Sequence, residues 1–483
     1  MEVDAVDYGE DWRDEEVFKG RHACSGGIEE AGAPHLSHRI HGDPPMSSWN
    51  QRSALAAPLS AMDCRNYDAS AYAARVLRER KLAGSVIYAA LLVPGDHVSM
   101  PAGELGDDTW SSTSAAPRFV ACASSSGRVS VHSLASLVAS ERGRAPGEDG
   151  GGPWGGAGEG VRRVGEAQPV AAVQAHRGAA FGLKSCAMGG QPLLFSCGDD
   201  GRVAGWRWAD LLSSSASASD HAAPQASPCV DLVNPPTTSP AARGMAVVPE
   251  TNAIDADSQG NTLYSAAGNG CAYAWDLETQ KQVSEFRGHS DYLHCVVARP
   301  HHNQIMTGSE DGTCRVWDCR TATTVVCLNP FTARQVPLSS SSLSSSSLSS
   351  SSLSSSSSSS PWVSSLSVDA SSTWLLCGTG GGTASLFSLQ APSSALLRVS
   401  LGAPVHAVAI GRDTEEILVA GASPALTRLT FAGQLKSQTA TATPSIYSLH
   451  SHAPSQLVAV GGRGGTVDII TSIGSHLCTF QCA

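Results

Sequence analysis

Residues 308–321, GSEDGTCRVWDCRT, decide the fold. The pattern predicts a short strand, a tight turn at Asp311 and Gly312, and a second strand that ends with Trp317 and Asp318. Glycine readily adopts the positive φ of a two-residue hairpin turn, which gives this assignment a physical basis. Arg320, two residues beyond the Trp-Asp pair, needs a separate explanation.

The same hairpin occurs seven times when the chain is aligned on the turn glycine. Two copies, LLFSCGDDGRVAGWRW and TLYSAAGNGCAYAWDL, match QIMTGSEDGTCRVWDC position for position. Turn positions with no insertion between them, such as Gly270 and Gly312, lie about 40 residues apart, the length of a four-stranded propeller blade. The copies are residues 119–134, 193–208, 262–277, 304–319, 374–389, 416–431 and 456–471.

Burial decides how such repeats assemble. The first strand of a copy is short and apolar, as in residues 305–307, which is typical of a strand buried between neighbouring sheets. One such sheet cannot bury both of its faces, so the sheets must stack radially into a ring. We therefore predict an all-β fold, a seven-bladed β-propeller over residues 84–483. An ordinary β-sandwich with chance Asp-Gly turns is the alternative.

Histidines ahead of two hairpins indicate which kind of propeller this is. His289 precedes Thr307, Asp311 and Trp317 in the fourth copy. These four residues resemble the hydrogen-bonded His–Thr–Asp–Trp set of WD40 blades, in which a buried imidazole and a buried indole find partners. We interpret the histidines as structural and not catalytic. The corresponding set in the second copy is His176, Ser196, Asp200 and Trp206.

Several segments fall outside the repeat pattern. Residues 1–61 lack periodicity, and we expect a disordered or non-native extension there, with the functional protein beginning near Met62. The sequence of residues 62–83 predicts a short helix. Three low-complexity stretches are expected to be flexible loops inserted in the propeller, since they are rich in glycine or serine and show no helix or strand period. These stretches lie near residues 141–160, 213–226 and 332–361.

Composition limits the possible functions. The 483 residues include 32 Lys and Arg against 43 Asp and Glu, a net charge of −11. Phosphate affinity comes mainly from basic side chains, so strong direct binding to RNA or DNA is not expected. The sequence contains no signal peptide and no apolar run of about 18 residues, so we expect no membrane contact and an intracellular protein with reduced thiols.

No chemical signature indicates catalysis. The chain has no GxxxxGK[ST] loop, no GxSxG elbow and no HExxH helix, and its glycine clusters stand at hairpin turns. Five of the 14 cysteines, Cys122, Cys197, Cys271, Cys314 and Cys377, fall in apolar strand-like runs, where free cysteine behaves as a small buried hydrophobe. The only place in the sequence where a cysteine and several histidines cluster is Cys295, with His294, His301 and His302. We interpret this cluster as loop histidines beside a buried thiol. We predict a non-catalytic scaffold without cofactor or metal.

From residue 193 to residue 480 the chain closely resembles plant-type members of the THO complex subunit 6 family, which are seven-bladed WD40 proteins. The segments LLFSCGDDGRV, FRGHSDYLHCVV, TGSEDGTCRVWDC and GSHLCTF carry the resemblance. It does not cover residues 1–61, the glycine-rich insertion or the serine tract. The resemblance implies a nuclear THO/TREX subunit in co-transcriptional mRNA packaging and export. Its partners would be other THO subunits, with RNA contacted mostly indirectly.

A second resemblance concerns Arg320. Residues 305–320 are similar to the WDxR box of WD40 proteins that dock onto the damaged-DNA-binding adaptor of cullin-4 ubiquitin ligases. This similarity implies docking through Trp317, Asp318 and Arg320, and an alternative role as a substrate receptor, linked in a plant relative to abscisic acid signalling. Two simpler alternatives stay open: Arg320 only solvates a strand end, or the chain is an unrelated WD40 scaffold.

Overall fold

The computed structural model describes residues 84–95, 116–142, 165–213, 226–238, 245–257, 261–332, 335–336, 362–391, 395–411 and 416–482. The chain divides into two units, and the blades belong to the unit made of Ala73–Thr237 and Ala246–Ala483. Of the other unit, Met1–Tyr72 with Thr238–Met245, the structure describes only Thr238 and Met245. The predicted extension 1–61 and the predicted helix 62–83 lie outside the described residues.

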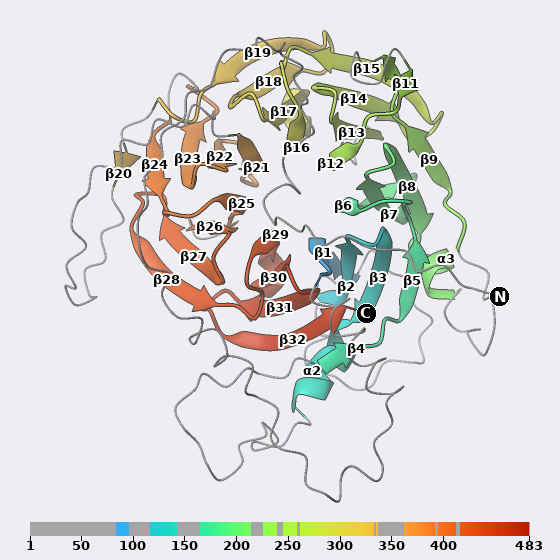
Figure 1. Cartoon of the computed structure of the whole chain (residues 1–483), viewed down its shortest axis with the longest axis vertical. Coiled ribbons are helices and arrows are strands. Elements are labelled where there is room, and N and C mark those ends of the chain that lie inside the picture. The colour runs from blue at the N-terminus through green and yellow to red at the C-terminus, as the bar shows by residue number, and fades with distance from the viewer. Residues whose placement is uncertain are drawn as a thin grey trace, which may run out of the picture. The chain divides into compact units, whose positions relative to one another are not determined.

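The prediction of a seven-bladed β-propeller is confirmed. Each blade is an antiparallel sheet of four strands in chain order, with its first strand innermost and its fourth outermost around a central axis (Figure 1). The blades, in order, are β1 (Ile87–Pro94), β2 (Pro117–Ser124), β3 (Arg128–Ser133) and β5 (Ala171–Gln174); β6 (Ala180–Met188), β7 (Gln191–Gly198), β8 (Arg202–Arg207) and β9 (Val230–Val233); β12 (Thr251–Asp257), β13 (Thr262–Ala267), β14 (Cys271–Asp276) and β15 (Lys281–Arg287); β16 (Leu293–Arg299), β17 (Gln304–Ser309), β18 (Cys314–Asp318) and β19 (Thr323–Leu328); β21 (Val363–Val368), β22 (Trp374–Thr379), β23 (Thr383–Ser388) and β24 (Leu397–Ser400); β25 (Val405–Ile410), β26 (Glu416–Gly421), β27 (Ala425–Thr430) and β28 (Leu435–Ala440); and β29 (Ile446–His452), β30 (Leu457–Gly462), β31 (Thr466–Thr471) and β32 (His476–Cys482).

Each sequence copy supplies the second and third strands of one blade. In blade 4, Ile305 pairs with Trp317 and Gly308 pairs with Cys314, so the hairpin turns where the sequence predicts it. Gly312 has φ +79°, the conformation that favours glycine at this place. The copies therefore mark the middle of each sheet, whereas the first and fourth strands carry no common sequence signature.

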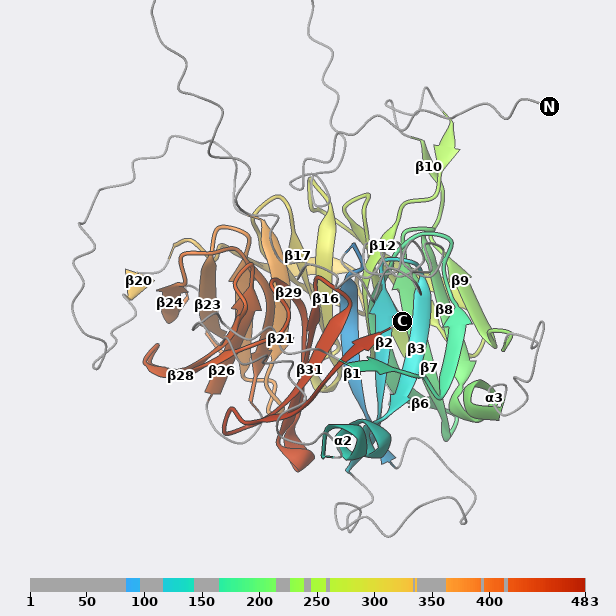
Figure 2. The same ribbon diagram turned by 60° about the horizontal axis from the view of Figure 1, so that its bottom comes forward.

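The ring has two rims, and shorter elements lie in the loops between the strands. Because adjacent strands run in opposite directions, the loops after the first and third strands open on one rim, which we call the Arg320 rim. The loops after the second and fourth strands open on the other, the His289 rim. Helices α2 (Leu134–Arg142) and α3 (Trp208–Ser213) each follow a third strand and lie on the same side of the ring (Figure 2). The 3-10 turns η4 (Pro300–His302) and η5 (Ala453–Ser455) follow first strands, and β10 (Thr237–Thr238) and β11 (Ala246–Val247) lie outside the blades.

The structure corrects the edges of the predicted loops. Helix α2 extends to Arg142, into the stretch predicted as a loop from residue 141, because no helix-breaking residue precedes the glycine at position 143. Helix α3 includes Ser213. Strand β20 (Gln335–Val336), inside the predicted loop 332–361, pairs in parallel with β24. The other residues of these three stretches, apart from Ala226 and Thr332, lie outside the described part of the chain.

The core of the propeller lies between the blades. Among the described residues, buried apolar side chains form seven clusters, and each cluster joins two neighbouring blades. One cluster joins Ile87 of β1 with Phe480 of β32 and so connects the first blade with the last. Strand β4 (Gly165–Ala167), from the third-to-fourth connection of blade 1, also pairs in parallel with β32. The ring is thus closed by packing and by one borrowed strand.

The closing cluster generates the first prediction. We expect Phe480→Ala to lower the free energy of unfolding by about 3–5 kcal/mol, because Phe480 is 2 % exposed and fills the contact between blades 7 and 1. Ile473→Ala is the control, since that side chain is 83 % exposed and its loss should change stability by no more than about 0.5 kcal/mol. Denaturant unfolding followed by tryptophan fluorescence measures both. Equal losses in the two variants would contradict this account of closure.

Candidate protein-docking site

A chain of hydrogen bonds at the His289 rim fixes the fourth blade. The Trp317 indole Nε1 donates to Thr307 Oγ1 at 2.8 Å, and the same hydroxyl lies 2.8 Å from His289 Nε2. His289 Nδ1 lies 2.8 Å from Asp311 Oδ2. An indole can only donate and a carboxylate only accepts, so the hydroxyl donates to Nε2 and the Nδ1–H of a neutral imidazole donates to Asp311. Every polar atom of this buried chain therefore has a partner.

Electrostatics at Asp311 follow from the same contacts. Burial acts to raise the pKa of its carboxyl, but hydrogen bonds from His289 and Thr313 outweigh it and hold the pKa well below its usual range. Both side chains are largely shielded from solvent. The pair is a structural support for the turn at the rim, and the geometry offers no open position next to the imidazole for a substrate.

The corresponding set in blade 2 is incomplete. His176 lies 2.8 Å from Ser196 Oγ and 2.9 Å from Asp200 Oδ1, as in blade 4. Trp206, however, donates its indole N–H to the backbone oxygen of Ala226 at 3.2 Å, so its expected place in this set is wrong. Its buried N–H needs only one acceptor, and the segment before β9 supplies it.

Blade 3 contains half of such a set, which the sequence pattern had not singled out. Trp275 donates to Ser265 Oγ at 2.9 Å. The spacing of ten residues between the hydroxyl and the indole is the signal that would have found this pair, because Thr307 and Trp317 have the same spacing.

Arg320 lies on the opposite rim, in the turn between β18 and β19. Its Nε and a terminal nitrogen donate to the two oxygens of Asp318 at 3.1 and 2.8 Å, and its backbone N–H donates to the same carboxylate at 2.8 Å. The side-chain hydrogen bond from Arg320 lowers the pKa of Asp318 to about 2. The Arg320 side chain is 71 % exposed. Asp318 therefore holds a solvent-facing guanidinium in one orientation, with donors left for a partner.

The third residue proposed for docking has a different position. Trp317 is 1 % exposed and packs in the cluster between blades 3 and 4. It cannot contact a docked protein directly. Its contribution to this rim is to fix the end of β18, from which Asp318 and Arg320 follow.

The histidines near Cys295 do not come together with it. His294 and Cys295 lie near the start of β16, and His294 faces Glu310 at 3.5 Å. His301 and His302 lie in η4, beyond the other end of the same strand. A seven-residue strand spans roughly 20 Å, too far for one metal ion.

An arc of aromatic rings on the innermost strands was not foreseen. Tyr88 contacts Phe181 with ring centroids 5.2 Å apart and Tyr447 at 5.9 Å, and Tyr447 stacks on His406 at 4.7 Å with planes 7° apart. The four residues come from blades 6, 7, 1 and 2. Each is the second residue of its blade's first strand, but a single ring at each place gives the sequence no recognisable motif.

Comparison with known proteins places these features in a family context. Residues 280–318, which include β15 to β18, match the WD domain, G-beta repeat family. Among the described residues, no helix is both long and apolar enough to cross a membrane.

Similarity to complete proteins covers most of the chain. THO complex subunit 6 of Arabidopsis thaliana is 35 % identical over 424 residues, covering 87 % of this chain and 98 % of the relative. THO complex subunit 6 of Homo sapiens is 26 % identical over 368 residues, covering 75 % and 89 % respectively. The homologue of Mus musculus shows the same identity and coverage.

The blade-4 hydrogen bonds generate the second prediction. We expect Thr307→Val, which keeps the side-chain shape, to lower the free energy of unfolding by about 2–4 kcal/mol, because it removes the shared partner of His289 and Trp317. Thr323→Val, on the exposed side of β19, is the control and should be nearly neutral. Chemical denaturation measures both. A neutral Thr307→Val would show that the chain of hydrogen bonds contributes little.

The third prediction concerns pH. The pKa of Asp311 is lowered in the folded state, so its contribution to stability is present above the unfolded pKa of about 3.9 and is lost as the pH falls through the folded value. We expect the stability difference between wild type and Asp311→Asn to be constant near neutral pH and to shrink below about pH 4. Urea unfolding at stepped pH measures it. A difference that stays constant down to pH 2.5 would contradict the ionised carboxylate.

Proposed function

Because the chain belongs to the THO complex subunit 6 family, we propose that it is a non-catalytic scaffold subunit of the THO complex. One observation carries this proposal: the Arabidopsis relative is matched over 98 % of its length, so the similarity extends far beyond one WD repeat. The blade-4 and blade-2 histidines are engaged in structural hydrogen bonds, which supports a binding role rather than catalysis.

The ring offers two kinds of surface for partner subunits. The rims carry the variable loops and the ends of the strands. The perimeter carries the outermost strands, whose outer edges another chain can pair with. Three consecutive outermost strands, β9, β15 and β19, each present one valine that is about half exposed: Val233, Val283 and Val325. We propose that THO partners contact the perimeter of blades 2 to 4.

Membership of the family supports a proposal for the cellular process. We propose that the protein acts in co-transcriptional mRNA packaging and nuclear export, in the nucleus. The net charge of −11 supports indirect contact with RNA, because an acidic chain is a poor general ligand for phosphate. Basic partner subunits would then make the direct contacts.

Arg320 supports a second candidate function, that of a substrate receptor for a cullin-4 ubiquitin ligase, possible alongside the first because it uses a different face. The exposed guanidinium, held by Asp318 at the end of β18, supports this proposal, because its remaining donors can form charge-assisted hydrogen bonds with a docked protein. Pairing within the chain also fits a solvated strand end, so only a binding experiment separates the two explanations.

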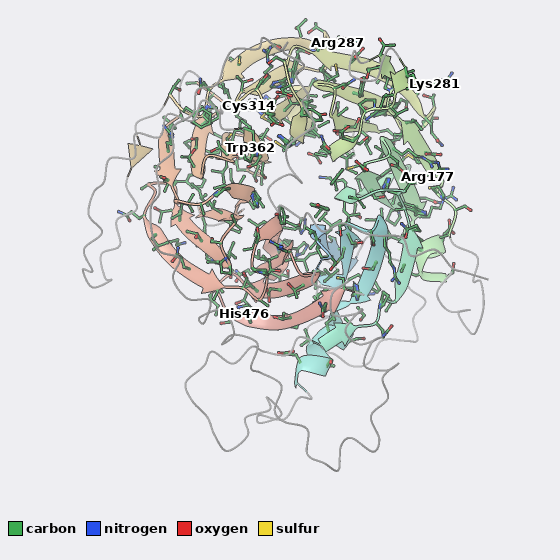
Figure 3. The ribbon with its side chains drawn as sticks, viewed as in Figure 1. Arg177, Lys281, Arg287, Cys314, Trp362 and His476 are labelled. Atoms are coloured by element: carbon green, nitrogen blue, oxygen red, sulfur yellow. The ribbon has the colours of Figure 1, made fainter. Side chains whose placement is uncertain are left out.

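Affinity purification with mass spectrometry tests both functions and is the fourth prediction. We expect tagged wild type and Arg320→Ala to recover the same THO subunits, because the proposed THO surface lies on the perimeter. The control is Arg177→Ala, an exposed arginine in the loop between β5 and β6, on the His289 rim and outside the proposed THO surface (Figure 3). It removes the same charge from a different place.

The outcomes separate the functions. Recovery of THO subunits with all three proteins, without the cullin-4 adaptor, supports the scaffold and makes Arg320 a solvated strand end. Recovery of the adaptor with wild type and Arg177→Ala but not with Arg320→Ala adds the receptor function. Absence of THO subunits from every sample would contradict the scaffold proposal.

A further inference from the structure

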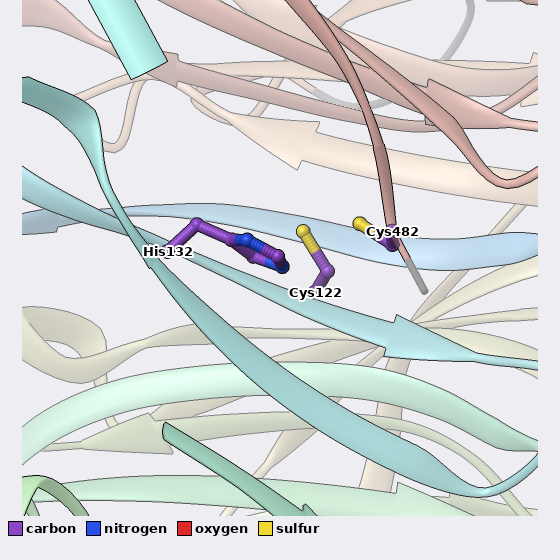
Figure 4. Close-up of side chains that lie close together, drawn as sticks. All are labelled: Cys122, His132 and Cys482. Atoms are coloured by element: carbon purple, nitrogen blue, oxygen red, sulfur yellow. The ribbon is translucent and has the colours of Figure 1, made fainter. Parts of the chain in front are cut away.

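Two thiols and an imidazole meet where the first and last blades join. Cys122 of β2, His132 of β3 and Cys482 of β32 each offer a ligand atom, and these three atoms lie within 4.8 Å of one another (Figure 4). All three residues are buried, and the His132 side chain is fully enclosed. Cys482 is far in the sequence from Cys122 and His132, so the cluster exists only because the ring closes.

The cluster occupies positions that other blades use for the His–Thr–Asp–Trp set. When the hairpins are superposed by strand register, Cys122 takes the place of Thr307, and His132 takes the place of Trp317. In blade 4 the equivalent hydroxyl and indole are joined by a hydrogen bond, and every polar atom has a partner. Blade 1 therefore replaces a satisfied oxygen–nitrogen pair with a sulfur–nitrogen pair and receives a second sulfur from blade 7.

One nitrogen of the imidazole in this cluster lacks a hydrogen-bond partner within the described residues. His132 Nε2 lies 3.0 Å from Ser130 Oγ, but Nδ1 has no hydrogen-bond partner within the described residues. A buried polar atom without a partner is costly, and a ligand or ion commonly explains it. The Phe480 ring packs beside His132 with centroids 5.0 Å apart and supplies no acceptor there.

The donor set identifies the missing ligand. Two cysteine sulfurs with one histidine nitrogen are typical ligands of Zn²⁺, with bonds of about 2.3 Å to sulfur and about 2.0 Å to nitrogen. Tetrahedral bonds of that length place two sulfurs about 3.8 Å apart, so only a small contraction of the present cluster is needed. Two thiolates and one Zn²⁺ also sum to zero charge, which suits a buried site.

We propose that Cys122, His132 and Cys482 bind a zinc ion that links blade 1 to blade 7. The ion supplies the bond that His132 lacks. Ser130 Oγ lies on the other nitrogen of the imidazole, Nε2, and so orients the ring as an outer partner of the site. Because the site forms only when the ring closes, zinc binding stabilises the closed propeller.

Metal analysis of the full-length protein tests the proposal. We expect chain purified without added chelator to contain one zinc ion per molecule, and chain refolded with Co²⁺ to show sulfur-to-cobalt charge-transfer absorption. Cys482→Ser should lose both signals. Cys478→Ser is the matched control: Cys478 is also buried and lies on the same strand but outside the cluster, so this variant should keep both.

Each outcome decides the question. Zinc in wild type and Cys478→Ser, absent from Cys482→Ser, supports the site. If Cys482→Ser fails to fold, His132→Gln, which keeps a polar side chain of similar length, replaces it in the same measurement. Folded wild type without zinc and without a cobalt thiolate band overturns the proposal. A Cys122–Cys482 disulfide found by mass spectrometry under non-reducing conditions also overturns it, because the sulfurs would then not be metal ligands.

Discussion

Every blade depends on the packing of its sheet against the next one. A four-stranded sheet of this kind buries apolar side chains on both faces, and neither face is covered within the blade itself. The seven interblade clusters in the described part of the chain are therefore one continuous constraint, and the contact between blades 7 and 1 completes it. That contact joins the ends of a long chain, so its loop-closure entropy is the largest in the ring. We therefore expect truncation of a side chain at this junction to lower the stability of the fold more than truncation of its equivalent elsewhere.

Polar side chains serve the same constraint in two ways. In blade 4, His289, Thr307, Asp311 and Trp317 fix the hairpin against the loop that enters the blade, and all their polar atoms are satisfied. At the junction of blades 7 and 1 the equivalent positions hold a cysteine sulfur and an imidazole. His132 Nδ1 has no hydrogen-bond partner there within the described residues. The two arrangements share their positions in the blade but differ in chemistry. In blade 4 the side chains satisfy one another by hydrogen bonds, whereas the sulfur and nitrogen donors at the junction suit a metal ion.

The surfaces proposed for partner binding are separate from this internal architecture. Arg320 and Asp318 stand on one rim, the histidine hydrogen bonds stand at the other, and the half-exposed valines follow the perimeter. A rigid ring can therefore present independent surfaces, and a change at one of them need not disturb the others. This separation makes the proposed THO scaffold function compatible with the proposed ligase-docking function, and it allows a single arginine to distinguish them.

The sequence by itself determined the seven hairpins, the ring they require and the blade-4 hydrogen bonds, because turn glycines, apolar strands and the His–Thr–Asp–Trp spacing are local signals. It did not determine the partner of Trp206 or the aromatic arc, because each depends on which neighbouring segment fills a space. Cys122, His132 and Cys482 were invisible as a group, since no spacing along the chain relates residue 482 to residue 122. Only the tertiary structure brings them together, because ring closure places the last strand beside the first blade.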